Sequence, residues 1–135
     1  MTLLRAGVKL VGPFMFFGSY PMYLLTVRGR KSGLPRTVAV AIMQRNGKRY
    51  VGSPYGIVDW VRNLRAAGEA TLTRGRRSET IRAAEVAPGE AALILREEVK
   101  RGNPFMRFFG ITAESSLEDL ERAAASHPLF SLETK

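Results

Sequence analysis

The stretch that decides the fold reads Tyr23-Leu24-Leu25-Thr26-Val27, then Arg28-Gly29-Arg30-Lys31-Ser32-Gly33-Leu34-Pro35-Arg36, then, after Thr37, Val38-Ala39-Val40-Ala41-Ile42-Met43. The middle segment is a turn, because glycine tolerates positive φ and proline fixes φ. It carries four cations and no carboxylate in nine residues. A strand–turn–strand unit of this kind gathers backbone N–H groups, a hydroxyl and positive charge, which suits a phosphate or carboxylate. The alternative is a solvated basic hairpin end.

The apolar run at 38–43 continues over six positions, so we expect a strand at 36–45 that is covered on both faces. Strands at about 22–28 and 48–54 flank it. Asn46-Gly47 is the strongest hairpin signal in the chain, because a type I′ turn needs positive φ at both central residues.

A short helix is expected at 60–67, with Asp59 as its N-cap and Gly68 at its C-terminal stop. Trp60 on this helix is interpreted as a core anchor. Asn63 lies on nearly the same side, and on a half-buried face its amide needs a hydrogen-bond partner.

The remaining elements follow from turn and capping signals. Before the barrel strands we expect a helix at 3–17 that is broken near Gly12-Pro13. After the short helix we expect a hairpin of 69–74 and 76–86 that turns at Gly75, and then a helix from Pro88 to Gly102 with Ala92, Leu95 and Val99 buried. An irregular segment at 103–111, a helix from the capping box Ser115-Ser116-Leu117-Glu118 to Ser126, and a strand at 129–132 complete the chain. His127 before Pro128 is interpreted as a structural turn residue. The order predicts an α+β fold, a small and mostly antiparallel barrel with peripheral helices.

Composition narrows the class of partner. At 135 residues the chain is expected to form one domain, 1–135, with 1–17 as an N-terminal helical segment. Residues 1–82 hold fifteen Lys and Arg against three Asp and Glu, a net charge of +12, whereas 83–135 carry −3. The basic part is expected to face nucleic acid, lipid headgroups or a phosphorylated small molecule. With no cysteine and one histidine, no metal site is expected.

The uncharged stretch from Leu10 to Val27 raises the membrane question. Gly12, Pro13 and Pro21 interrupt it, so a spanning helix is not expected. A signal peptide is not expected either, and cytoplasm is the default compartment. Peripheral membrane contact through residues 1–17 stays open, because cations there stand beside aromatic residues.

Several motifs in order resemble the deazaflavin-dependent nitroreductase family. They are Gly29-Arg30-Lys31-Ser32-Gly33, Pro35-Arg36, Ser53-Pro54-Tyr55-Gly56, Asp59-Trp60-x-x-Asn63-Leu64 and the closing His127-Pro128-Leu129-Phe130. The resemblance implies a split β-barrel of the FMN-binding, pyridoxamine-phosphate-oxidase-like type. It also implies coenzyme F420, an 8-hydroxy-5-deazaflavin with a phosphate and a polyglutamate tail, with FMN as the alternative cofactor.

The same resemblance assigns roles to residues. Arg30, Lys31 and Arg36 would hold the phosphate and tail carboxylates, with Ser32 and Gly33 adding a hydroxyl and a backbone donor. The full cofactor-binding set is Arg30, Lys31, Ser32, Gly33, Pro35, Arg36, Thr37, Val38, Ala39, Pro54, Tyr55, Gly56, Trp60 and Asn63. Tyr55 is the catalytic candidate, as a proton donor, and solvent is the alternative source of the proton.

The implied reaction is hydride transfer from reduced F420 to an activated apolar acceptor, which is a quinone, an enone, an unsaturated acyl compound or a nitro compound. The chain departs from the best-known nitroreductases at Ala41, Pro54 and Tyr55, where they carry a tyrosine, a serine and a lysine. Phe105, Phe108 and Phe109 stand where they have substrate-side tyrosines. An apolar pocket of this kind suits quinones, enones or long acyl chains better than nitroimidazoles.

Two other functions stay open at this point. One is a cofactor-binding or carrier barrel that holds F420, FMN or haem without turnover. The other is a small basic barrel that binds nucleic acid, for which Tyr50 and Tyr55 offer stacking, although the aromatic residues are not interleaved with the basic ones. Nucleic acid is therefore not the expected partner, and the oligomeric state is expected to be a monomer or a homodimer.

Overall fold

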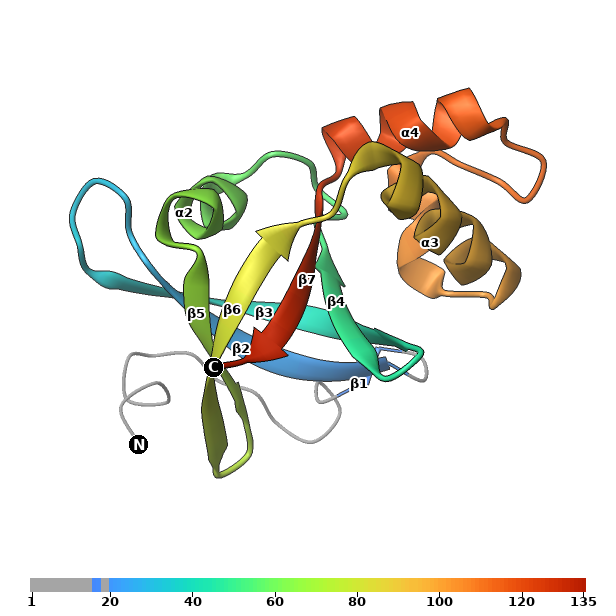
Figure 1. Ribbon diagram of the computed structural model, residues 1–135. Helices are drawn as coiled ribbons and strands as arrows, with labels where there is room; N and C mark the ends of the chain where they lie inside the picture. Colours follow the sequence, from blue (N-terminus) through green and yellow to red (C-terminus); the bar gives the residue numbers. More distant parts are fainter. Residues whose placement is uncertain (1–15, 18–19) are drawn as a thin grey trace.

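Six antiparallel strands close into a barrel in this computed structural model, which describes residues 16–17 and 20–135 (Figure 1). Its elements are β1 (Phe16–Phe17), β2 (Tyr20–Arg28), β3 (Pro35–Arg45), β4 (Lys48–Gly52), α2 (Asp59–Ala67), β5 (Glu69–Arg74), β6 (Arg77–Glu85), α3 (Pro88–Lys100), the 3₁₀ helix η2 (Pro104–Phe109), α4 (Leu117–Ser126) and β7 (Leu129–Thr134). The strand order is β2-β3-β4-β7-β6-β5, and β5 pairs back onto β2 to close the barrel. The antiparallel barrel with peripheral helices confirms the predicted fold class.

Strand β3 divides the molecule into two cores. Val40 and Ile42 are buried inside the barrel, whereas Ala41 and Met43 pack on the opposite face against the helices. Successive residues of a strand point to opposite faces, so a continuous apolar run serves both cores. The prediction of a strand covered on both faces is confirmed.

Helices α3, η2 and α4 build the second core on the outside of the barrel. Their buried residues pack with Tyr20, Met43, Tyr50 and Leu129 of the strands. In Figure 1, α3 and α4 lie together on one side of the barrel, away from α2. One wall of the molecule is therefore helical, and the opposite end is left to α2 and the β2–β3 turn.

Helix α2 covers the barrel end beside the β2–β3 turn (Figure 1). Val61 and Leu64 are 0% and 1% exposed and belong to the barrel core. Trp60 is half-buried and packs against that core, with its ring centroid 6.2 Å from that of Phe130. Gly68 ends the helix with φ of 71° and donates its N–H to the Leu64 carbonyl, as predicted.

The Asn46-Gly47 turn joins β3 to β4 with φ of 52° and 77°, which confirms the predicted hairpin. Pro88 is at the first position of α3, also as predicted. Strand boundaries differ by a few residues from those expected, because frayed ends are set by neighbouring strands rather than by local sequence.

Four expectations about the helices are wrong in detail. Val58, not Asp59, is the N-cap of α2, and Asp59 lies in the first turn, where a carboxylate also favours the helix dipole. Ser116 caps α4 by accepting the N–H of Asp119, so the capping residue is one position later than the predicted box. The segment expected to be irregular contains η2. The buried stripe of α3 is wider than predicted: Ala92 and Leu95 are buried as expected and Val99 is half-buried against the same core, but Ala91, Ile94 and Glu98 are buried as well.

The N-terminal expectations mostly lie outside the described residues. Phe16–Phe17 form a strand that pairs with Tyr20–Pro21 of β2, so a helix does not extend to residue 17. The rest of the 3–17 segment, and its contact with a membrane, lie outside residues 16–17 and 20–135. Within these described residues, the helices are too short to form an apolar membrane span.

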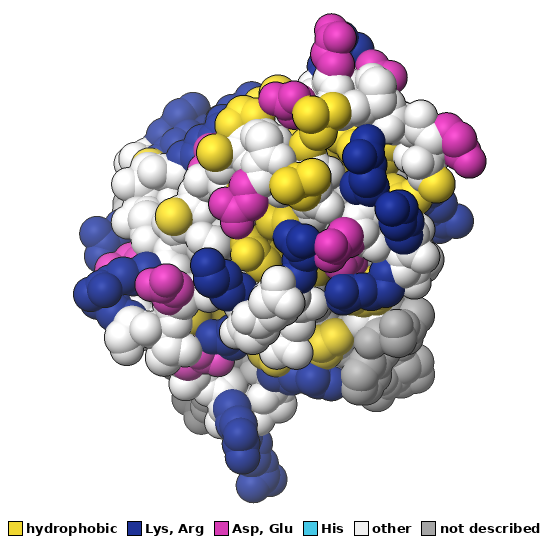
Figure 2. Space-filling view, turned by 45° about the vertical axis from the view of Figure 1, so that its right-hand side comes forward, with side chains coloured by type: hydrophobic (Ala, Val, Ile, Leu, Met, Phe, Trp, Pro, Cys, Tyr) yellow, Lys and Arg dark blue, Asp and Glu magenta, His cyan; other side chains and the backbone are white. Residues whose placement is uncertain are grey.

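Surface charge follows the asymmetry of the sequence. Figure 2 shows acidic side chains at the top of the molecule, where α4 carries Glu118, Asp119 and Glu121, and basic side chains projecting at the bottom, where the β5–β6 turn lies. Basic side chains are therefore not confined to one region of the face in Figure 2, and charge alone does not locate a site.

Candidate functional site

The basic turn, defined as residues 28–36, is closed by its own hydrogen bonds. Gly29 donates its N–H to the Leu34 carbonyl at 2.8 Å, and Gly33 donates to the Gly29 carbonyl at 2.9 Å. The Ser32 hydroxyl oxygen accepts the N–H of Leu34 at 3.1 Å. Both glycines are needed, because Gly33 has φ of 75° and a Cβ on Gly29 would lie 3.0 Å from Ser32 Oγ. The turn therefore has a defined shape before any ligand binds.

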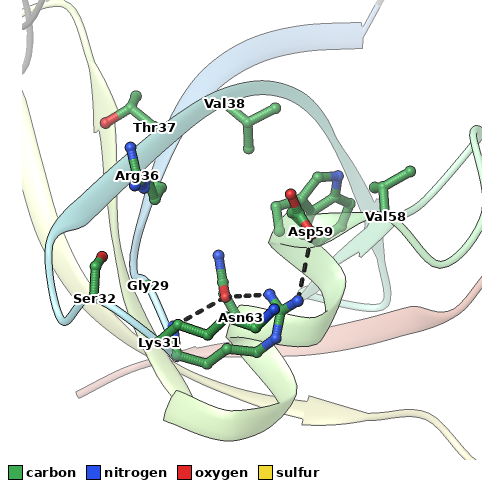
Figure 3. Close-up of a pocket in the computed structure, with 11 residues that line it drawn as sticks. Gly29, Lys31, Ser32, Arg36, Thr37, Val38, Val58, Asp59 and Asn63 are labelled. Atoms are coloured by element: carbon green, nitrogen blue, oxygen red, sulfur yellow. Dashed lines mark hydrogen bonds and ion pairs between the residues drawn. The ribbon is translucent and has the colours of Figure 1, made fainter.

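Asn63 of α2 ties this turn to the barrel end. Its Oδ1 accepts from the backbone N–H of Arg30 at 3.1 Å and from Arg30 Nη1 at 2.7 Å (Figure 3). Asn63 is 5% exposed, so its acceptor oxygen is largely shielded from water, whereas the Arg30 side chain is 26% exposed. Arg30 Nη2 also lies 3.4 Å from Asp59 Oδ1. The predicted need of the Asn63 amide for a partner is confirmed, and that partner is Arg30.

A polar cavity of about 610 Å³ opens between the basic turn, β3 and α2 (Figure 3). Lys31 and Arg36 line it, and both are exposed. Within the described part of the chain, neither cation has a hydrogen-bond or ion-pair partner, whereas Arg30 has two. Lys31 and Arg36 are therefore the charges available to an anion.

A second cavity of about 960 Å³ lies along the basic turn and extends to α2, β5 and β6. It shares Arg30, Lys31 and Ser32 with the polar cavity and adds Arg28 and Glu69. The basic turn is thus the common wall of two open cavities.

An apolar cavity of about 280 Å³ lies on the outward face of β3. Its lining consists of Met22, Val38, Ala39, Val40, Ala41, Met43, Gly52, Pro54, Tyr55, Trp60, Asn103, Phe105, Met106 and Phe109. Ala39 and Ala41 leave space on the strand, and η2 forms the facing wall. Val38 and Trp60 line this cavity and the polar cavity alike, so the two adjoin.

The loop after β4 forms the rim of the apolar cavity. Buried Ser53 donates its hydroxyl to the Gly56 carbonyl, and its own carbonyl accepts from His127 Nδ1 at 3.0 Å. His127 is the C-cap of α4, in line with its predicted structural role. Tyr55 is 72% exposed, with its ring centroid 5.4 Å from that of Phe108. The Tyr55 hydroxyl is therefore open to solvent.

A buried polar cluster stands behind the apolar cavity. Glu98 is 0% exposed, and its Oε1 accepts from the Tyr20 hydroxyl at 3.0 Å and from Asn103 Nδ2 at 2.8 Å. Burial, with the neighbouring Glu98, raises the pKa of Tyr20 to about 12. Tyr20 thus stays protonated and donates its hydrogen bond throughout the physiological range.

Sequence reasoning missed this cluster. Asn103 had a signal, since an Asn before Pro104 is a typical start of a helix. Glu98 had a weaker one, because it lies three and four positions after Leu95 and Ile94 on the face of α3 that proves to be buried.

The structure brings most of the predicted site residues together. Arg30, Lys31, Ser32, Arg36, Thr37, Val38, Trp60 and Asn63 line the polar cavity; Gly33 and Pro35 line the second cavity; Ala39, Pro54 and Tyr55 line the apolar cavity. Gly56 lines none of these three cavities. Of the expected phenylalanines, Phe105 and Phe109 line the apolar cavity, and Phe108 packs on Tyr55 instead.

The closed antiparallel barrel is the split-barrel fold, and solved structures share it. A structure titled F420-H2 Dependent Reductase (FDR-A) is 22% identical, with a TM-score of 0.58, over 84% of this chain and 94% of that one. A putative pyridoxamine 5′-phosphate oxidase from Listeria innocua is 10% identical, with a TM-score of 0.57, over 84% and 83%. A structure described as a domain-swapped dimer is 19% identical, with a TM-score of 0.58, over 98% and 94%.

The family model for F420H(2)-dependent quinone reductases matches residues 3–109, and the chain belongs to this family. It is therefore an F420H2-dependent oxidoreductase, as the resemblance predicted, and family membership implies F420 as the cofactor. No curated protein matches the chain significantly.

Proposed function

We propose that the protein reduces an apolar conjugated acceptor, a quinone or an enone, with hydride from F420H2. The observation that carries this proposal is the junction of the polar and apolar cavities at Val38 and Trp60. A cofactor with an anionic tail and an aromatic ring needs a cationic and an apolar environment side by side. The cations of the basic turn and the apolar lining beside them fit the anionic tail and the aromatic ring of F420.

The anionic end is assigned to the basic turn. Lys31 and Arg36 hold the phosphate and tail carboxylates, since they lack partners among the described residues. Ser32 is left with its hydroxyl hydrogen as a donor, because its oxygen accepts from Leu34. Gly33 contributes the shape of the turn, since its N–H is used by Gly29. Arg30 acts mainly through Asn63, by fixing α2 against the turn.

The ring end is assigned to β3 and the loop after β4. Thr37, Val38 and Ala39 would hold the ring from β3, Pro54 and Tyr55 would hold it from the loop after β4, and Trp60 would close the junction of the two cavities. The bound cofactor supplies the hydride, and the chain binds, orients and excludes water. The acceptor occupies the remaining wall, which Ala41, Phe105 and Phe109 make apolar.

Tyr55 is proposed as the proton donor, with solvent as the competing source. Its hydroxyl is exposed and borders the apolar cavity, which supports either route. Replacement of Tyr55 by Phe distinguishes them: a proton from Tyr55 predicts a lower kcat with cofactor affinity unchanged, and a proton from solvent predicts no change in kcat.

Titration with oxidised F420 tests the binding assignment. Cofactor fluorescence should be quenched with micromolar or tighter affinity, and absence of binding at millimolar cofactor contradicts the proposal. Turnover is then measured with reduced F420 and a panel of quinones, enones, nitroaromatics and unsaturated acyl compounds. Quinones and enones should react fastest. Tight binding without oxidation by any acceptor would instead indicate a carrier protein.

A further inference from the structure

The wall of the apolar cavity contains a buried side-chain amide, that of Asn103. Asn103 is 5% exposed and stands among Phe105, Met106 and Phe109 in the lining. Tyr55 and Trp60 also bring polar atoms to the lining, but Tyr55 is 72% exposed and Trp60 is half-buried. A buried polar group in such a wall requires hydrogen-bond partners.

Two bonds fix the orientation of the Asn103 amide. Its Oδ1 accepts the N–H of Phe105 at 2.9 Å, and its Nδ2 donates to Glu98 Oε1 at 2.8 Å. An amide nitrogen carries two hydrogens. Among residues 16–17 and 20–135, Glu98 is the only acceptor for this nitrogen, so one of its two N–H groups has no partner there, in a residue that lines the cavity.

Glu98 holds this amide from behind. Its Oε1 is shared by Tyr20 and Asn103, while its Oε2 has no hydrogen-bond donor within the described part of the chain and lies 3.4 Å from Arg101 Nη1. Burying a carboxyl costs free energy that an apolar side chain would not cost. The neighbouring inward positions of α3, among them Ile94 and Leu95, are apolar. Packing of the helix alone therefore gives no reason for a carboxyl here, whereas orientation of Asn103 does.

We propose that Asn103 binds the acceptor by donating its second N–H to a conjugated carbonyl oxygen, and that Glu98 is the positioning residue for this amide. The inference rests on the proposed function, which seats the acceptor against η2. The acceptor would gain a hydride at carbon from the reduced cofactor and a proton at oxygen from Tyr55 or solvent, and the cofactor would return to its oxidised form by releasing its remaining ring proton to solvent. Negative charge develops on the carbonyl oxygen before it is protonated, and an oriented N–H donor stabilises that charge. The substrate class is thus a conjugated carbonyl compound.

The test uses Trp60, the only tryptophan of the chain, which lines the cavity. Binding of the enone carvone to the cofactor-free protein is followed by quenching of Trp60 fluorescence. Limonene, a hydrocarbon with the same carbon skeleton but no carbonyl, is measured by its displacement of carvone. Asn103→Leu should weaken carvone binding about fivefold to tenfold, the size of one hydrogen bond, and leave limonene binding within about twofold.

Further variants separate binding from structural damage. Asn103→Ser keeps an oxygen that can cap η2 and should lose the carbonyl preference as well. Met106→Leu, on the same wall, is the matched control and should change both affinities alike. Glu98→Gln keeps an acceptor for Asn103 and should retain the preference, whereas Glu98→Leu should lose it. If the Asn103 and Glu98 variants bound carvone and limonene more weakly by the same factor, the inference would be overturned.

The cofactor titration keeps this result separate from the proposed function. Asn103→Leu should bind oxidised F420 within about twofold of the wild type. If Asn103→Leu weakens F420 binding more than carvone binding, the amide serves the cofactor. The inference then fails, while the proposed function stands. If the wild type binds no F420, the proposed function fails, and the carvone and limonene titrations still decide the role of Asn103.

Discussion

Two buried asparagines, Asn63 and Asn103, hold the two ends of the site in opposite ways. Each is 5% exposed. Asn63 uses its oxygen to accept twice from a cation, Arg30, whereas Asn103 uses its nitrogen to donate to an acid, Glu98. The first bond set fixes a turn with exposed positive charge, and the second fixes a group in an apolar wall. Under the proposed function, the first end sets cofactor affinity and the second sets acceptor selectivity.

The two ends of the site also differ in the solution condition, ionic strength or pH, to which they respond. Lys31 and Arg36 are exposed to solvent, so salt screens their attraction for an anion. Tyr20 and Glu98 are buried, so salt screens their hydrogen bond poorly, and ionisation of Tyr20 is what disturbs it. Cofactor affinity should depend on ionic strength, and the integrity of the apolar end should depend on alkaline pH.

The largest effect is expected at the polar end. Replacing both Lys31 and Arg36 by Ala should weaken F420 binding by about a hundredfold or more, because each charge-assisted hydrogen bond contributes roughly 1.5–3 kcal/mol. Fluorescence titration with oxidised F420 at low salt measures this loss of affinity. Arg76→Ala with Arg77→Ala removes the same charge from the β5–β6 turn and should have little effect. Equal losses in the two double variants would mean that only net charge matters.

The next effect concerns the apolar end at high pH. The pKa of Tyr20 is raised from 10.0 to about 12, so the unfolded chain loses this proton first as pH rises. Tyr20 stabilises the fold fully below pH 10, and this contribution is lost between pH 10 and 12, by up to about 2.5 kcal/mol. Urea unfolding of the wild type and Tyr20→Phe over this range measures the difference. Parallel pH profiles would contradict the burial of the Tyr20 hydroxyl beside Glu98.

A smaller effect tests the Asn63 anchor. Asn63→Ala should lower the free energy of unfolding by about 1–2 kcal/mol, since it removes two hydrogen bonds to Arg30. Asn63→Asp keeps an acceptor oxygen for Arg30 and should retain more of the stability. Its added negative charge at the polar cavity should still weaken F420 binding. If both variants were as stable as the wild type, Asn63 would not hold the turn.

The smallest effect is expected for Asp59, the other partner of Arg30. The Asp59 side chain is 85% exposed and its ion pair is 3.4 Å long, so Asp59→Asn should change stability by less than about 0.5 kcal/mol. Chemical denaturation alongside Asn63→Ala measures it. A loss as large as that of Asn63→Ala would shift the anchoring role from the amide to the ion pair.

The barrel was predictable because its signals are local. Asn46-Gly47 and the apolar run of β3 define a hairpin and a strand with two buried faces without any tertiary information. The need of Asn63 for a partner was also visible. The identity of that partner was not, because Arg30 is 33 residues away and meets Asn63 only when α2 closes the barrel end.

The apolar end was less predictable for the same reason. Glu98 reads as a solvent-facing residue on α3 until Tyr20, 78 residues away, supplies its hydrogen bond. The predicted buried stripe of Ala92, Leu95 and Val99 therefore did not include Glu98. Asp59 failed as an N-cap because a carboxylate is equally favourable in the first turn, and sequence alone does not separate the two positions.

Strand β3 has a consequence for how this protein can diversify. Its Val40 and Ile42 belong to the barrel core, while Ala41 packs on the opposite face and lines the apolar cavity. Substitution at Ala41 can resize the cavity while Val40 and Ile42 keep the barrel core intact. Two traits that usually evolve in conflict, fold robustness and substrate range, are thus encoded at alternating positions of one strand and are open to independent selection.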